Sequence, residues 1–259
     1  AKLDGVLQPM RVQFTTDATG AYSYPFIAAS CVATNSDPVM FDSMRTRVGP
    51  VSGKTAELIT HLGDENYTDT NSAAAGAYLN VLRPPLGKTH QGPFYRSAAF
   101  EIMSSDHDRW GPNCDSTTAA AGVIPAYLDQ ANRLFPTYDL PAVNTDGAQY
   151  RSAPRGRVLH IWTDGRTYMS AIAATDNASK TKLGAVQEQW VKDQLLYAKN
   201  NNLAIVLYLE DGGMTATSSF TGDDTWGAYK TAWNNIVSYA SAIGVLTRLL
   251  VICGDFHGR

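Results

Sequence analysis

Short apolar runs that end at a polar residue recur along the chain, and they limit the folds that it can adopt. The clearest runs span 158–162, 203–209 and 249–253. Each has the length and continuous apolar character of a strand buried on both faces of a sheet. An aspartate stands two residues after the end of each run, namely Asp164, Asp211 and Asp255. The sequence therefore predicts buried strands whose ends carry polar side chains.

Two longer segments between these strands have the spacing of helices. In 184–202, apolar residues recur at helical intervals, and the final asparagine run ends the pattern. In 225–244, one helical face would be aromatic and apolar. That face consists of Trp226, Tyr229, Trp233, Ile236 and Tyr239. Strands that alternate with helices predict an α/β fold with α+β layering, in which loops after the strands form the functional site.

The earlier part of the chain contains weaker signals of the same kind. The segment 10–30 predicts two strands around a turn at 17–20, the second ending at Ser30 and Cys31. The stretch 55–63 predicts a strand or the end of a helix, and 97–103 predicts a strand that ends in polar residues.

Composition and charge exclude some functional classes. The chain has 259 residues, enough for one large domain, and a formal net charge of -3. This charge gives no reason to expect nucleic-acid binding, and no apolar run approaches the roughly 18 residues of a membrane span. The three cysteines cannot all pair within the chain. Cys253 lies in an apolar strand, whereas Cys31 and Cys114 could form a disulfide or take part in chemistry.

Four stretches that follow apolar runs contain residues able to bind metals, namely AASC, HLGDENYTD, SSDHDRWGPN and GDFHG. Singly, each has an ordinary explanation, since Gly-Asp pairs are common in turns and a cysteine at a strand end is more often buried than reactive. Together they would meet at one edge of the sheet. There they could hold two cations about 3.5–4 Å apart, bridged by a carboxylate. No GxSxG motif of a serine hydrolase is present.

At these residues the sequence resembles the alkaline phosphatase D (PhoD-like) family of calcineurin-like metallophosphoesterases. That family carries a strand ending in SC, then HLGDYIYE, WDDHDFGPN, LDTRSYR, LGxxQ..WL, DxWxGY and LSGDVHG. The corresponding stretches here are AASC, HLGDENYTD, SSDHDRWGPN, WTDGRTYMS, LGAVQEQWV, DDTWGAY and VICGDFHG. Their order is the same, and the resemblance extends from about Arg11 to the last residue.

The resemblance implies a β-sandwich flanked by helices, with metals at the strand ends. It assigns residues 23–259 to the metallophosphoesterase domain and residues 1–22 to its first strands or to the end of an N-terminal β element. Family members continue beyond the GDxHG motif with a further strand. The sequence therefore leaves open that the domain is incomplete at its C-terminus.

For the first metal, the resemblance implies Cys31 and His257 as ligands. Asp64 would bridge the two metals, and Tyr67, three residues later, matches a tyrosinate that binds ferric iron in the purple acid phosphatases. A thiolate also suits a Lewis-acidic iron. The alternatives are a buried or disulfide-bonded thiol for Cys31 and a core or surface tyrosine for Tyr67.

For the second metal, the resemblance implies Asp106 and Asp255 as ligands, with Asn113 as a further ligand or substrate contact. His107 would stand beside this metal as the acid or transition-state stabiliser, and Arg166 would pair with a phosphoryl oxygen. The alternatives are a turn residue for Asn113 and a surface salt bridge for Arg166. Asp224 and Trp226 match a family segment near the site without an assigned role.

The implied activity is metal-dependent hydrolysis of a phosphate monoester or diester by a metal-held hydroxide. Fe³⁺ with Ca²⁺ is the favoured pair, with Zn²⁺ or Mn²⁺ as alternatives. Ser105 replaces the first aspartate of the family's DDH, which favours a second hypothesis, a catalytically weakened binding or structural module. The partner would be a small or polymeric phosphate ester, and family analogy favours secretion or the periplasm. The sequence leaves the oligomeric state open.

Overall fold

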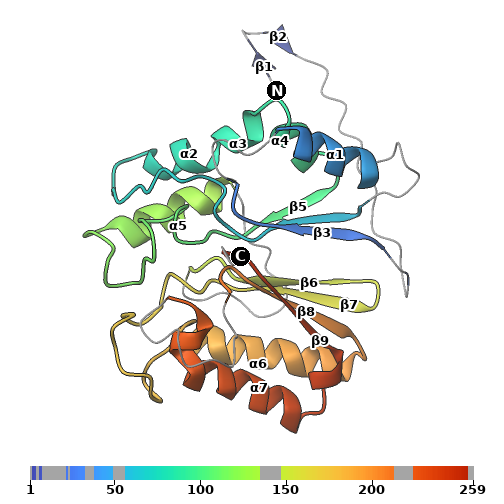
Figure 1. Ribbon diagram of the computed structural model, residues 1–259, viewed down its shortest axis with the longest axis vertical. Coiled ribbons are helices and arrows are strands. Elements are labelled where there is room, and N and C mark those ends of the chain that lie inside the picture. Colours follow the sequence, from blue (N-terminus) through green and yellow to red (C-terminus); the bar gives the residue numbers. More distant parts are fainter. Residues whose placement is uncertain are drawn as a thin grey trace.

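The computed structural model describes residues 2–3, 6–7, 22, 24–32, 38–48, 56–134, 147–212 and 224–255. Their elements stack in four layers, with helices outside and two sheets inside (Figure 1). The predicted mixed α/β class and the sandwich flanked by helices are both confirmed.

The first sheet is parallel and carries the earlier site residues at its carboxyl edge. Its order is β3 (Phe26–Ala29), β4 (Leu58–His61) and β5 (Ala99–Ile102). The central strand β4 is buried along its whole length, which accounts for its apolar character. Helices α1 (Pro38–Val48) and α4 (Gln91–Tyr95) contribute Phe41 and Phe94 to the core on one face of this sheet.

The second sheet carries the later site residues. Its order is β6 (Arg151–Arg155), β7 (Val158–Trp162), β8 (Ala204–Leu209) and β9 (Leu249–Cys253). β6 pairs antiparallel with β7, and the other pairs are parallel. The carboxyl ends of β7, β8 and β9 therefore lie at one edge. β7 and β9 have the bounds predicted from their apolar runs.

Helices α6 (Ala185–Asn200) and α7 (Lys230–Ala242) cover the outer face of the second sheet (Figure 1). The segment predicted as a single helix begins with the 3-10 turn η3 (Trp226–Tyr229) and then continues as α7. Trp226, Tyr229 and Ile236 are buried in the core as expected, whereas Trp233 and Tyr239 are only partly buried against it. The short turn η4 (Leu246–Arg248) leads into β9.

Residues of β8 alternate between two cores, as a strand buried on both faces requires. Ile205, Leu207 and Leu209 pack with the outer helices. Val206 and Tyr208 instead join a second core that also contains Leu58 of the first sheet. This second core lies between the sheets and fixes the relative position of their carboxyl edges.

A helical cluster flanks the first sheet beside the site loops. It comprises α2 (Ala77–Leu82), α3 (Pro84–Gly87) and α5 (Val123–Leu134). Tyr78 and Tyr127 pack there with Trp110, which lies in the loop after β5. This cluster thus anchors the loop that carries Asp106 and His107.

The N-terminal expectations fall largely on residues outside the described ranges, including the strand and turn at 10–20. Of residues 1–22, the structure describes a short antiparallel pair, β1 (Lys2–Leu3) with β2 (Val6–Leu7), and residue 22. Within the described ranges, no helix combines the length and apolar character required to span a membrane.

Candidate metal centre

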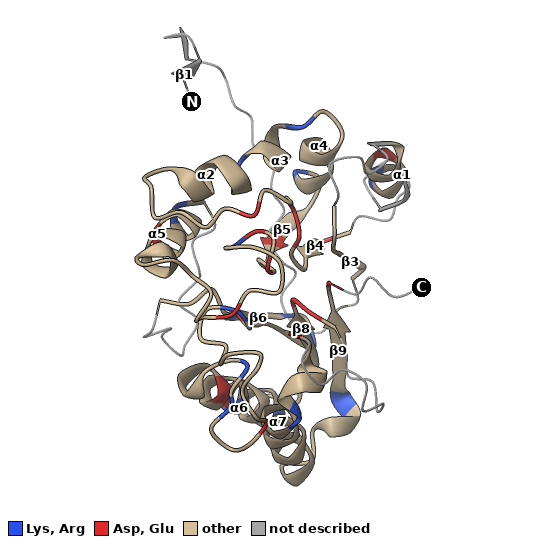
Figure 2. Cartoon of the chain, turned by 60° about the vertical axis from the view of Figure 1, so that its left-hand side comes forward, with Lys and Arg blue, Asp and Glu red and all other residues tan. Residues whose placement is uncertain are grey.

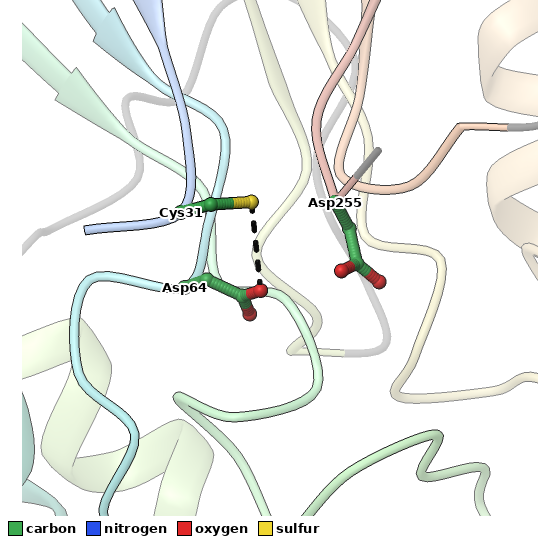
Figure 3. A group of neighbouring side chains, drawn as sticks. All are labelled: Cys31, Asp64 and Asp255. Carbon is green, nitrogen blue, oxygen red and sulfur yellow. Dashed lines mark hydrogen bonds between the residues drawn. The ribbon is translucent and has the colours of Figure 1, made fainter. Parts of the chain in front are cut away.

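Strand ends from both sheets bring metal-binding side chains to one place. Cys31 follows β3, Asp64 follows β4 and Asp255 follows β9, and the three side chains point toward a common space (Figure 3). Asp106 follows β5. Among the described residues, three overlapping groups have ligand atoms within 4.8 Å of one another. They are Cys31–Asp64–Asp255, Asp64–Asp106–His107 and Asp106–Asp224–Asp255. Acidic stretches after the strands of both sheets gather in the middle of the molecule (Figure 2).

The backbone at these strand ends is unusual. Cys31, Asp64 and Asp255 have φ values of 60°, 58° and 46°, in the left-handed region that non-glycine residues rarely adopt. Such conformations cost about 1–3 kcal/mol each and persist where the surroundings enforce them, often at functional sites. Asp69 and Asn113, which also contact the site, share this conformation. The strain is thus concentrated on the loops that aim the candidate ligands.

The first half of the centre combines sulfur, carboxylate and phenol. The Cys31 thiol lies 2.9 Å from Ser30 Oγ and donates to Asp64 Oδ2 at 3.7 Å. The Tyr67 hydroxyl donates to the same oxygen at 3.3 Å. Burial, with Asp64 and Asp255 nearby, raises the pKa of Cys31 to about 11. Burial and the carboxylate of Asp64 also raise the pKa of Tyr67.

The second half is built around Asp106. Its Oδ2 accepts the backbone N–H of Asn113 at 2.6 Å, and its Oδ1 accepts the N–H of His107 at 2.9 Å. Burial opposes ionisation, but the Arg166 guanidinium and the Asn113 N–H lower the pKa of Asp106. His107 Nδ1 lies 2.6 Å from Asp69 Oδ1, which leaves Nε2 as its other polar atom.

These residues fit metal ions. Asp64 Oδ1 is buried and has no hydrogen-bond partner among the described residues, and a cation would satisfy it. Burial and Asp106 raise the pKa of Asp64, and burial with Asp106 and Asp64 raises the pKa of Asp255 to about 9. Acids that oppose one another's ionisation are stabilised together by a bound cation. The thiol suits a softer or more Lewis-acidic metal, and the carboxylates suit a hard one.

A buried polar cluster supports the loop after β4. The Glu65 carboxylate accepts the Tyr95 hydroxyl at 2.8 Å and lies 2.9 Å from His61 Nε2. Asp108 Oδ1 accepts the backbone N–H groups of Glu65 and Asn66 at 2.9 and 3.0 Å. Burial, with Asp64 and Glu65 nearby, raises the pKa of Asp108 to about 8. Asp108 therefore ties the loop of Asp106 to the loop of Asp64.

The structure gathers six of the predicted site residues, namely Cys31, Asp64, Tyr67, Asp106, His107 and Asp255. Asn113 contributes its backbone, while its side chain is exposed. Arg166 is fully buried and ion-paired with Asp224, rather than part of a surface salt bridge. His257 lies outside the described residues. The cysteines are all free, so Cys31 and Cys114 are not paired.

Five residues at the centre were not predicted from the sequence as site residues. They are Asp69, Asp108, Arg109, Lys182 and Asp211. Asp211 follows β8 as Asp255 follows β9, so its place at a strand end was a usable signal. Asp69 ends the HLGDENYTD stretch, which was a usable signal, whereas Lys182 lies inside a loop and nothing in its spacing points to the site. Arg109 pairs with Asp164 at 2.8 Å and links the loops after β5 and β7.

Comparisons with known proteins identify the fold. No protein-family model and no curated protein matches the sequence. Among solved structures, the chain is similar to PhoD, with a TM-score of 0.70 and 18% sequence identity. The similarity covers 93% of this chain and 53% of the PhoD chain, so the present chain spans about half of that protein's length. At this identity the comparison establishes a PhoD-like fold.

Proposed function

We propose that the chain is a metal-dependent phosphoric ester hydrolase. The observation that supports this best is that Cys31, Asp64, Asp106 and Asp255, from strand ends of both sheets, form overlapping groups of possible ligands, and that Asp64, Asp106 and Asp255 are each common to two groups. A ligand shared in this way suits a bridge between two cations. The PhoD-like fold and the matching order of motifs support the same activity.

We further propose a ferric ion beside Cys31, Tyr67 and His257 and a calcium ion beside Asp106 and Asp255, with Zn²⁺ or Mn²⁺ as alternatives. Two bound cations would supply Lewis acidity toward a phosphoryl oxygen and lower the pKa of water. Asp64 would bind both cations. The sulfur and phenol donors on one side and the carboxylates on the other support two different metals.

The chain's own residues would position and protonate the substrate. Asp69 accepts the Nδ1 proton of His107, so that Nε2 can hold a proton for the leaving oxygen. Burial opposes protonation of His107, but Asp69, Asp106 and Asp64 raise its pKa overall. The backbone N–H of Asn113 donates to Asp106, and its exposed side chain would be a further contact for the substrate.

The alternative of a weakened module rests on Ser105. Its hydroxyl donates to Asp106 Oδ1 at 3.3 Å, as a neutral group where the family has a carboxylate. We favour the enzyme, because the candidate ligands do not depend on this position. The substrate would be a phosphate monoester or diester. From the family resemblance, we also propose that the protein is secreted or periplasmic.

Hydrolysis of p-nitrophenyl phosphate and bis(p-nitrophenyl) phosphate by the wild-type protein tests this proposal. Chelation should abolish turnover, and iron with calcium, zinc or manganese should restore it. Asp64→Asn should be inactive, whereas Asp129→Asn, a change at an exposed acid on α5, should match wild type. Failure of every metal to give turnover of either ester, with metal bound, would favour the weakened module.

A further inference from the structure

The Arg166 guanidinium lies among carboxylates from three different segments. Nη2 lies 3.3 Å from Asp255 Oδ2 and 3.4 Å from Asp211 Oδ2. Nη1 pairs with Asp224 Oδ2 and donates to the Cys114 carbonyl at 3.3 Å. We propose that Arg166 is a positioning residue that holds Asp255 in place for a metal, rather than a group that binds the phosphoryl oxygens.

The location of these partners explains what Arg166 can hold. It follows β7, Asp211 follows β8 and Asp255 follows β9, and these strands are neighbours in the sheet. Asp224 lies just before η3. One planar side chain thus ties together three strand ends of the second sheet and the segment before η3. A guanidinium suits this task because its rigid fork of N–H groups fixes several acceptors at once.

Contacts through Asp164 also fix the position of Arg166. Its backbone N–H donates to Asp164 Oδ1 at 3.3 Å. Asp164 also accepts the Thr167 N–H at 3.0 Å and pairs with Arg109 from the loop after β5. The position of Arg166 is therefore fixed relative to the loop that carries Asp106. Through Arg166, Asp255 of the second sheet is aligned with ligands of the first.

Burial argues against contact between Arg166 and substrate. The side chain is 0% exposed, and both terminal nitrogens already have acidic partners. To reach a phosphoryl oxygen, the guanidinium would have to abandon buried carboxylates and leave them uncompensated, which is costly. Lys182 also contacts Asp211 and the Asp224 carbonyl, and it further confines the cluster.

A positioning role and a purely electrostatic role of Arg166 predict opposite effects of its replacement on metal affinity. If Arg166 acted through its charge alone, its removal would relieve repulsion of a nearby cation and strengthen binding. Nη2 of Arg166 contacts Asp255 Oδ2 directly, so we expect the effect on the position of Asp255 to exceed the effect of charge. Loss of the contact between Arg166 and Asp255 should therefore weaken metal binding. A lysine keeps the charge but loses the planar fork, so it separates the two effects.

The inference rests on the proposed metal site, and metal binding tests it without any measurement of hydrolysis. Metal-stripped wild type, Arg166→Lys and Arg166→Gln would be titrated with Mn²⁺ alone by calorimetry. We expect both variants to bind Mn²⁺ about 10–100-fold more weakly, the usual effect of losing a residue that orients a ligand. If Arg166→Gln does not fold, the milder Arg166→Lys decides the question.

Arg151→Lys is the matched control. Arg151 is also a buried arginine, and it pairs with Glu101 across the two sheets at 2.7 Å. It lies on β6, three strand spacings or about 14 Å from β9. Its replacement should leave Mn²⁺ affinity unchanged. Wild-type Mn²⁺ affinity in Arg166→Lys, or tighter Mn²⁺ binding in Arg166→Gln, would overturn this inference but leave the proposed function standing. If the wild type bound neither Mn²⁺ nor Fe³⁺, Ca²⁺ or Zn²⁺ in the same titration, the proposed function would be overturned as well.

Discussion

At the scale of single residues, His107 divides its two ring nitrogens between different tasks. Nδ1 lies 2.6 Å from Asp69 Oδ1, and the ring lies against Tyr67 with centroids 4.3 Å apart. Its ligand atoms lie within 4.8 Å of those of Asp64 and Asp106. This placement is compatible with an acid beside the metals and also with a metal ligand, and a substitution can separate the two roles.

For His107→Ala we expect turnover to fall by about 10²–10⁴-fold, because the acid for the leaving group is lost. Both metals should remain bound, since the other candidate ligands are untouched. Turnover and metal content would be measured on the same preparation. Loss of a metal in this variant would identify His107 as a ligand and contradict its role as the acid.

Cys31 and Tyr67 make a prediction about colour. A thiolate or phenolate bound to ferric iron should donate charge in the visible range, whereas zinc with its filled d shell gives no such band. We expect protein purified aerobically with iron to be coloured. Tyr67→Phe and Cys31→Ser should each shift or abolish the band. An active, iron-loaded protein with an unchanged spectrum in both variants would contradict the iron assignment.

At the scale of elements, glycines permit the strand ends to approach closely. A Cβ at Gly254 would lie 2.7 Å from the Leu62 carbonyl oxygen and 2.9 Å from Ser30 Oγ. A Cβ at Gly63 would lie 2.4 Å from the Ser105 backbone nitrogen. The first contact joins the end of β9 to the ends of β3 and β4, across the two sheets. The second joins the ends of β4 and β5.

Gly254→Ala should therefore push Asp255 away from Cys31 and Asp64. We expect a loss of about 1–3 kcal/mol in the free energy of unfolding from overpacking, together with weaker metal binding. Gly87→Ala is the control, because a Cβ there meets nothing within 4 Å. Denaturant unfolding and metal titration would measure both effects. Metal affinity equal to wild type in Gly254→Ala would show that this close approach is not required.

The elements that could be predicted are those whose own residues determine them. β9 is a continuous apolar run and β7 is apolar except for His160, and the bounds of both were predicted from the sequence. The helix α2 was not predicted, since it begins at Gly76 without a side-chain cap. Its Tyr78 N–H is instead bound at 2.9 Å by Gln130, a residue of α5. Such a long-range contact leaves no local pattern.

In the site, too, residues at strand ends could be predicted from the sequence, whereas contacts between distant loops could not. Cys31, Asp64 and Asp255 lie within three residues of strand ends, so their positions in the sequence were a usable signal, and the packing of the two sheets brings them together. The burial of Arg166 depends on Asp211 and Asp224 closing around it. That arrangement requires the packing of loops far apart in sequence, and sequence spacing could not predict it.

At the scale of the whole molecule, the joint between the two sheets contains a buried histidine. His160 Nδ1 lies 2.8 Å from the Tyr208 hydroxyl, and Nε2 contacts the Tyr24 hydroxyl. The ring stacks on Trp162 and meets the edge of Phe26 from the first sheet. Burial, with Arg155 nearby, lowers the pKa of His160 to about 4.

This pKa predicts acid sensitivity of the sandwich. The unfolded chain binds the proton at about pH 6.5 and the folded chain only near pH 4. The unfolded state thus takes up more protons in this window, and stability falls as the pH falls through it. We expect His160 to account for a loss of about 3 kcal/mol between pH 7 and pH 4. Denaturant unfolding across this range would measure it.

His160→Gln should lack this part of the pH dependence, because an amide does not titrate. An identical pH dependence in wild type and His160→Gln would show that the joint between the sheets is not the acid-sensitive element.

The most direct test of the whole account is the metal content of the wild type and of Asp64→Ala, measured by plasma emission on protein purified without chelator. Asp64 is the proposed bridge between the two metals, so its loss should empty or disorder the entire centre. Asp255→Ala should weaken one metal preferentially. We expect two metals per chain in the wild type and none in Asp64→Ala. Full retention of both metals in Asp64→Ala would contradict the bridged centre at the strand ends.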